Sequence, residues 1–303
     1  MIPPVAARLP DGNRLHLQHG PIDLIIEVTG PAPVVADAET AAIGRFETIL
    51  DELVPQLTML RSSVGSGEPQ GTVATRMVEA ATPFAEVFVT PMVAVAGSVA
   101  DEVLAAIVRV PDVVRAYVNN GGDVAFHLTA GTSLNVGLVP SPTSGRPAHV
   151  LQVTPDLPVR GAATSGAGGR SFSFGIADGV TVLASRTALA DAAASLIANA
   201  VDLPGHPAIE RAPADELDPD SDLGDRPVTV AVHELSDTDI ATALDRGVAT
   251  AERWCQQVPE LYGAVLGLRG HTRIVGVRDG AIADPSTTPT GAGEVLEEAH
   301  RAR

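Results

Sequence analysis

Residues 161–201 read GAATSGAGGRSFSFGIADGVTVLASRTALADAAASLIANAV, which places a Ser- and Gly-rich loop, a short buried strand and an alanine-rich helix in succession. Upstream, residues 118–124 read VNNGGDV, where a strand ends in two asparagines, two glycines and a carboxylate. Both segments bring backbone N–H groups and polar side chains to strand ends, which suits a phosphate-bearing ligand with a metal ion. We therefore expect the two segments to form one site.

The composition limits the kind of ligand and partner. The chain has 303 residues and is 45% hydrophobic, enough to bury a large core in one or two domains. Only 3% of the residues are aromatic, so a planar ligand would be held mainly by aliphatic side chains and backbone. The net charge of −17 disfavours nonspecific binding to nucleic acid or to anionic membranes. An anionic ligand would need a metal ion between it and the protein.

The N-terminal sequence and the cysteine content predict the compartment. The first twenty residues show neither the apolar segment of a signal peptide nor a lipoprotein cysteine. No uninterrupted apolar run reaches the roughly 18 residues of a membrane span, so we expect a cytoplasmic protein. The single cysteine, Cys255, excludes an intramolecular disulfide and a cysteine-rich zinc site. We expect it to be a buried, unreactive thiol.

Predicted strands and helices are mixed without strict alternation, which indicates an α+β fold with antiparallel or mixed sheets packed by helices. The predicted strands are 14–18, 23–29, 113–118, 124–128, 133–139, 149–153, 227–232, 264–268 and 273–277. The four between 113 and 153 are expected to share one antiparallel sheet. Besides the helix that contains Asp191, the predicted helices are 36–60, 73–81, 93–108 and 237–255.

The domain organisation is predicted from composition. Residues 1–211 are expected to form the core, and the acidic, proline-containing residues 212–226 a linker. Residues 227–278 are expected to add a β-α-β-β segment that completes the fold. The Gly-, Ala- and Glu-rich residues 279–303 are expected to be a flexible tail.

The loop that follows residue 162 offers groups that can hold a phosphate. Thr164 and Ser165 supply hydroxyl groups, and Gly166 lets the backbone approach a ligand. Arg170 is the nearby cation. The spacing matches neither the Walker P-loop nor the dinucleotide fingerprint, so a plain glycine-rich turn explains the loop equally well.

Asp191 and Ser195 stand four residues apart in a predicted helix and therefore share one face of it. A carboxylate and a hydroxyl so placed can give two oxygen ligands to Mg²⁺, which takes phosphate oxygens and waters for the rest. Alternatively, Asp191 is favoured near the helix start by the helix dipole, and Ser195 is a small packing residue. The spacing alone favours this second interpretation.

The turn at residues 119–123 is also open to two interpretations. Asn119, Asn120, Gly121, Gly122 and Asp123 make a good hairpin turn, and turn chemistry explains each of them. In a ligand site, the amides would bind the edge of a heterocycle, and Asp123 would accept a hydrogen bond or orient a metal-bound water. Neither interpretation is excluded.

Four sequence blocks, VNNGGDV, AATSG, GVTVLAS and LADAAAS, resemble in this order the motifs of the ApbE superfamily of flavin transferases. The segment PMVAVAGSVAD, residues 91–101, is similar to the family's Gly-containing helix. The resemblance covers residues 91–201 and points to an uncharacterised ApbE-related branch. It implies an α+β fold that binds FAD, coordination of Mg²⁺, and transfer of FMN to a threonine hydroxyl of an acceptor protein.

The resemblance also implies roles for single residues. Asp191 and Ser195 take the metal positions, with serine in place of the usual threonine. Asp123 and Ser165 are the candidate catalytic residues. The expected nucleotide contacts are Asn119, Asn120, Gly121, Gly122, Ala163, Thr164, Gly166 and Arg170. This chain departs from the family in two places: residues 166–178 contain no counterpart of the usual histidine, and Ala96 replaces a lysine.

Three functions follow from these patterns. The first is binding of a flavin nucleotide, or a similar phosphorylated heterocycle, with Mg²⁺, extending to FMN transfer. The second is hydrolysis of a small polar heterocycle through Asp123, Ser165 or Ser173. The third is a noncatalytic homo-oligomeric binding protein that keeps the fold and uses its glycine loops structurally.

Overall fold

A nine-stranded antiparallel sheet organises the chain, in the order β1-β2-β3-β4-β5-β8-β9-β12-β13. The computed structural model describes residues 3–138, 149–169, 171–276 and 282–283. The strands of the sheet are β1 (Val5–Arg8), β2 (Arg14–His19), β3 (Ile22–Thr29), β4 (Arg115–Asn120), β5 (Asp123–Leu128), β8 (Gly161–Ser165), β9 (Gly179–Ala184), β12 (Leu261–Leu268) and β13 (His271–Val275).

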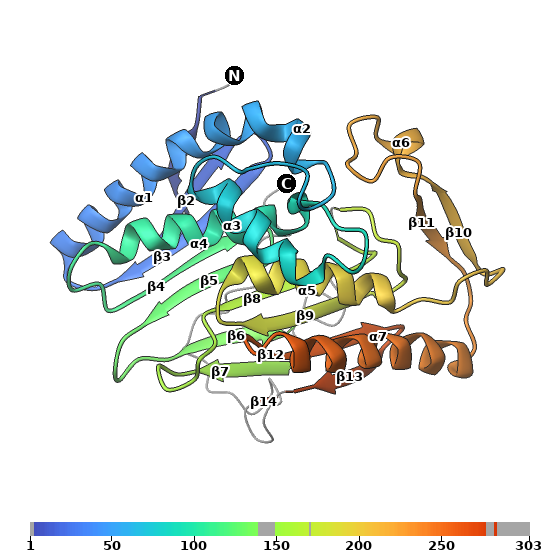
Figure 1. The fold of residues 1–303 in the computed structure, drawn as a ribbon. Coiled ribbons are helices and arrows are strands. Elements are labelled where there is room, and N and C mark those ends of the chain that lie inside the picture. Colours follow the sequence, from blue (N-terminus) through green and yellow to red (C-terminus); the bar gives the residue numbers. More distant parts are fainter. Residues whose placement is uncertain (1–2, 139–148, 170, 277–281, 284–303) are drawn as a thin grey trace.

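Long helices cover one face of this sheet (Figure 1). They are α1 (Ala32–Leu53), α3 (Thr72–Ala81), α4 (Val95–Val108), α5 (Thr187–Ala200) and α7 (Asp237–Gln257). Shorter elements are α2 (Leu57–Leu60), α6 (Ala214–Leu217) and the 3₁₀ turns η1 (Val54–Gln56), η2 (Thr82–Phe84) and η3 (Pro91–Ala94). Apolar side chains alternate along the strands, so Leu24 and Ile26 pack under the helices while Ile25 faces the other side.

A second, three-stranded sheet in the order β14-β7-β6 packs on the opposite face. Its strands are β6 (Leu134–Leu138), β7 (His149–Val153) and β14 (Ile282–Ala283). Val136 and Leu151 of this sheet share a buried cluster with Tyr117 and Phe126 of the large sheet. The α+β fold class is therefore confirmed. The expectation of one sheet for residues 113–153 is wrong, because β4 and β5 belong to the large sheet and β6 and β7 to the small one.

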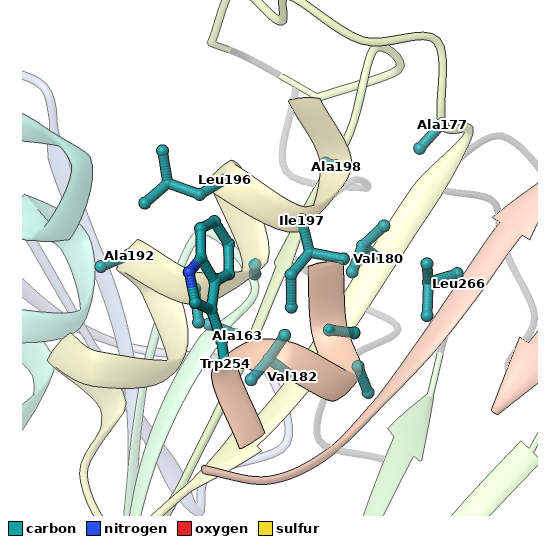
Figure 2. Packing of buried hydrophobic residues seen from close by; sticks show 14 of the residues in the cluster. Ala163, Ala177, Val180, Val182, Ala192, Leu196, Ile197, Ala198, Trp254 and Leu266 are labelled. Carbon is teal, nitrogen blue, oxygen red and sulfur yellow. The ribbon is translucent and has the colours of Figure 1, made fainter. Parts of the chain in front are cut away.

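Helix α5 lies at the centre of the largest core cluster. Its alanines are buried around most of its circumference, which is typical of a core helix rather than an amphipathic surface helix. Figure 2 shows Trp254 of α7 lying against α5 beside Ile197. Trp254 is 2% exposed, and its ring meets Phe84 edge-on at 4.9 Å between centroids. Small side chains on α5 thus let α7 and the sheet approach closely.

One apolar segment, Pro91–Val108, combines η3 and α4. Its length and its mean hydropathy of 1.7 would let it cross a membrane, but 61% of it is buried inside the fold. It contacts α1, α3 and α5 as well as β4 and β5, as a core helix does.

Residues 212–226, expected to be a linker, contain the end of β10 (Ile209–Pro213) and all of α6. β10 pairs with β11 (Pro227–Val232) in a separate two-stranded sheet. We call residues 209–232 the arm. Beyond it, β12 pairs with β9 in the large sheet, so the C-terminal segment continues the same sheet. The expected tail, residues 279–303, falls outside the described residues except for β14.

Candidate functional site

The two sequence blocks meet at one end of the large sheet. The register pairs Asn120 with Asp123 across the β4–β5 turn, and Val124 with Ala162 between β5 and β8. Because these strands are antiparallel, the start of β5 and the end of β8 lie at the same end of the sheet. The Asp123 carboxylate reaches the neighbouring strand, where its Oδ1 accepts the Thr164 N–H at 3.3 Å.

The alternation of side chains divides the candidate residues between the two faces of the sheet. On the helix face, the Asn120 amide donates to the Ala96 carbonyl at 3.0 Å. On the opposite face, the Thr164 hydroxyl lies 2.8 Å from that of Thr181. Asn119 also alternates away from the helices, and its Oδ1 accepts the Gly122 N–H at 2.9 Å. The two asparagine side chains therefore lie on opposite faces of the sheet.

The glycines of the turn are required by the backbone. Gly121 and Gly122 have φ angles of 67° and 114°, values that side-chain-bearing residues rarely adopt. Gly166 has a different reason, since a Cβ there would lie 2.7 Å from the Asp178 carbonyl. Ala163 is buried in the core beneath the helices. Arg170 lies outside the described residues.

Asp191 stabilises the start of a helix, but not of its own. Its Oδ2 accepts the Gly97 N–H of α4 at 2.9 Å. The start of α5 is stabilised by Asp101 of α4, whose two oxygens accept the N–H groups of Thr187 and Ala188 at 3.0 and 2.9 Å. Each helix thus supplies the carboxylate that caps the other.

We expect Asp101→Ala to destabilise the protein by about 2 kcal/mol, because it leaves two buried N–H groups without an acceptor. Asp101→Asn should cost less, since its amide oxygen can still accept one of them. Chemical denaturation followed by circular dichroism measures both values. Equal stability of the alanine variant and the wild type would contradict the capping role.

Asp123 and Asp191 are both buried, at 7% and 8% exposure. Burial raises the pKa of Asp123 to about 7, against the smaller effect of the Thr164 N–H. Burial, and then the charge of Asp123, raise the pKa of Asp191 well above its usual range. Within the described part of the chain, no basic side chain forms an ion pair with either group. The two carboxylates therefore repel each other, and among the described residues no ion pair balances their charge.

Two hydroxyl groups adjoin this pair. Ser195 lies one helical turn beyond Asp191, and its Oγ donates to the Ser165 Oγ at 3.1 Å. The structure thus brings Asp191, Ser195 and Ser165 together, although Ser195 bonds to Ser165 and not to Asp191. The described residues contain no cluster of three or more His, Cys, Asp or Glu side chains able to hold a metal ion. The oxygen donors suit Mg²⁺, which completes its shell with waters and phosphate oxygens.

Sequence reasoning missed the residues that fix the loop after Ser165. The backbone of Phe174 is held on both sides: the Asn199 Oδ1 accepts its N–H at 2.9 Å, and the Arg211 guanidinium donates to its carbonyl. These partners lie 25 and 37 residues away in sequence. No local spacing could have indicated them.

Comparison with known proteins places this chain in a family. A family model described as "AbpE bacteria" matches residues 6–274. The UPF0280 protein of Methanopyrus kandleri is 39% identical over 184 residues, which are 58% of this chain and 69% of that protein. The UPF0280 protein of Methanosarcina acetivorans is 31% identical over 199 residues, 64% of this chain and 75% of that protein. A UPF0280 protein of Methanosphaerula palustris is 41% identical over 114 residues, and the match spans about half its length, 47%.

Two solved structures that align over most of this chain carry flavin transferase names. The flavinyl transferase ApbE of Pseudomonas stutzeri in its apo form has a TM-score of 0.39 at 11% identity, covering 92% of this chain and 97% of that one. The flavin transferase ApbE of Vibrio cholerae has a TM-score of 0.41 at 11% identity, covering 90% and 98%. The match of the family model to residues 6–274 carries the assignment: the chain belongs to the family described as AbpE bacteria.

Proposed function

We propose that this protein binds a flavin nucleotide, or a similar phosphorylated heterocycle, together with Mg²⁺. The site lies at the end of the sheet that holds Asp123, next to Asp191 of helix α5. The buried carboxylate pair carries the proposal. Two like charges in one buried place are costly, and a divalent cation bound by these residues would offset that cost. The choice of a flavin rests on the family and on its four sequence blocks.

The residues present fit such a metal ion. The Asp191 carboxylate has backbone hydrogen bonds with Gly97 and Ala96, and its oxygens have further lone pairs that a metal ion could use. Asp123 and the Ser195 hydroxyl would supply further oxygens. When bound, Mg²⁺ would neutralise phosphate charge on the ligand. This matters in a chain whose net charge of −17 repels anions.

The nucleotide would lie over the strand ends. The β4–β5 turn at Gly121 and Gly122 is open, with no atom within 4 Å of where a Cβ would stand on either glycine. The hydroxyl of Ser165 and the backbone of the loop after it would form the other side. Transfer of FMN to an acceptor protein is the extension of this proposal. The pKa of about 7 belongs to Asp123 without a metal ion, so in this transfer the carboxylate would serve as a metal ligand and not as the base.

The same pKa favours a second candidate, hydrolysis of a small polar heterocycle with Asp123 as general base. A panel of chemically diverse ring compounds tests it. Turnover that is lost in Asp123→Asn would support this candidate, and no turnover across the panel would reject it.

The first test is a titration with FAD and FMN, with and without Mg²⁺, followed by flavin fluorescence and thermal shift. We expect metal-dependent binding by the wild type and a loss of at least about 10–100-fold in Mg²⁺ affinity for Asp191→Asn. Asparagine is preferred to alanine because its side-chain oxygen can still accept the Gly97 N–H. Loss of binding can then be separated from loss of fold.

Asp178→Asn is the matched control. Asp178 is another carboxyl whose pKa is raised by burial, but it accepts the Arg269 N–H. Its amide variant should bind nucleotide and metal as the wild type does. Flavin binding that is indifferent to Mg²⁺ and to Asp191→Asn would refute the metal site, and no flavin binding at all would refute the choice of ligand.

A further inference from the structure

The arm stands off the body beside the C-terminal end of α5 (Figure 1). At its base, Ile209 and Val232 pack against the core. Besides an exposed ion pair between Asp220 and Arg61 at 3.9 Å, hydrogen bonds and a cation–π contact join it to the body at two places that adjoin the site. The first is the loop after Ser165, and the second is the segment that leads into α4.

At the first attachment, the arm holds Ser173 and Phe174 of the loop that follows Ser165. The Thr229 N–H donates to the Ser173 carbonyl at 2.8 Å, and the Arg211 guanidinium donates to the carbonyl of Phe174. Arg211 also donates to Asp202 Oδ1 at 2.5 Å, which ties the contact to the end of α5. The base of the loop is thereby clamped between α5 and the arm.

At the second attachment, the far part of the arm reaches residues 88–90. The buried hydroxyl of Thr90, on a residue 3% exposed, donates to Asp222. The Arg226 guanidinium lies 3.4 Å from the centroid of the Phe88 ring. Thr90 directly precedes η3, and α4 follows with the Gly97 N–H that binds Asp191.

We infer that the arm is a strap that fixes the separation of these two segments, with Arg211 and Thr90 as positioning residues. One segment leads from Ser165 and the other leads to the partner of Asp191, so the strap sets the distance between the two sides of the site. The paired strands β10 and β11 give the strap the stiffness that a loop lacks. Its effect on a ligand rests on the function proposed above, whereas its effect on the two segments does not.

Removing the side-chain contact at either end of the strap tests the inference. Arg211→Met and Thr90→Val should each weaken Mg²⁺-dependent FAD binding by about tenfold. The double variant should be no weaker than the weaker single variant, because a strap released at one end no longer holds the other. If the two contacts acted independently, the double variant would lose about 100-fold in affinity, because the free-energy effects of separate sites add. That outcome overturns the strap.

Two further variants separate positioning from a general loss of structure. Thr90→Ser keeps the hydroxyl and should restore wild-type affinity. Arg273→Met removes a surface arginine on β13, whose Nε lies 3.7 Å from Asp245 Oδ1. This variant should bind FAD and Mg²⁺ with wild-type affinity. Weak binding by Thr90→Ser would count against the hydrogen bond to Asp222 as the cause.

Hydrogen exchange of the ligand-free protein keeps the test independent of the ligand. Thr90→Val should speed exchange at the amides of Phe174 and Gly175, although Thr90 contacts neither loop residue. If the wild type binds no nucleotide but this exchange rises, the proposed function fails and the strap stands. If nucleotide binds and the loop exchange is unchanged, the strap is overturned and the proposed function stands.

Discussion

Gly161→Ala is expected to destabilise the protein by about 3 kcal/mol or more, the upper range for overpacking a core. A Cβ on Gly161 would lie 2.3 Å from the Thr187 backbone nitrogen and 2.5 Å from its Cα. Thr187 cannot retreat, since Gly97 packs against its other side, where a Cβ would lie 2.5 Å from the Thr187 carbonyl oxygen. Its hydroxyl and its N–H are also bound, to the Val124 carbonyl and to Asp101. Relief of the clash must therefore move α5.

Gly44→Ala is the matched control for this substitution. Gly44 lies inside α1, and no atom lies within 4 Å of where its Cβ would stand. Alanine there should stabilise the protein by up to about 1 kcal/mol, because glycine is the poorer helix former. Urea unfolding of both variants gives the two values with opposite signs. Destabilisation of similar size in both would mean that the close approach at Thr187 does not limit packing.

Local sequence patterns were sufficient to predict most of the helices and strands. The hairpin of β2 and β3 follows from alternating apolar residues around a His-Gly-Pro turn. Helix α7 follows from helical periodicity, and its start at Ser236 has a capping box. These signals lie within a few residues of the structure they determine. The α+β class could be predicted for the same reason.

The pairing of distant segments could not be predicted in this way. The sequences of β6 and β7 look like further strands of the sheet that holds β4 and β5, because an apolar strand does not specify which sheet it joins. The acidic residues 212–226 look like a solvated linker, but Asp222 reaches Thr90, which is 132 residues away in sequence. Such contacts depend on the assembled fold.

In the candidate site, too, sequence motifs predicted some features, while contacts between distant residues could not be predicted. The sequence motifs predicted that the turn at Asp123 and the loop at Ser165 would lie together. The register places both at the same end of the large sheet. The motifs did not show that Asp191 caps α4 while Asp101 caps α5, because these contacts join residues 94 and 86 apart. The ligand roles of these residues stay predictions.

Without Mg²⁺, the free energy of unfolding is expected to fall as the pH rises from about 4 to about 7. The pKa of Asp123 is raised from 3.8 to about 7 in the folded protein, so the folded state holds a proton that the unfolded chain releases. Its stabilising effect is complete below the unfolded pKa and is lost as the pH passes through the folded one. The shift corresponds to about 4 kcal/mol at most, at roughly 1.4 kcal/mol per unit. The raised pKa of Asp191 acts in the same direction.

Other groups change stability with pH, so the comparison must be made with Asp123→Asn. Glu52 and Glu102 have lowered pKa values and titrate mainly below this window. His127, whose pKa is lowered by burial and by Arg160, acts in the opposite direction near neutral pH. Both effects are common to the wild type and Asp123→Asn, so the difference between their urea-unfolding profiles isolates the carboxyl pair. Identical slopes between pH 5 and about 8 would show that Asp123 does not hold the extra proton.

Mg²⁺ should offset part of this loss of stability at high pH. The ion binds the deprotonated carboxylates, so its effect should be weak at pH 5 and strong near pH 8, where saturation at about 100 times Kd would add about 2.7 kcal/mol. Asp123→Asn removes the repulsion and one metal oxygen together, so it should be more stable than the wild type at pH 8 without Mg²⁺ and gain little when the ion is added. The wild type could still lose stability between pH 5 and 7 but show no response to Mg²⁺ at pH 8. That result would mean that the carboxyl pair binds a proton and does not bind the metal ion. Asp123 would then act as a general base, which favours the hydrolytic alternative.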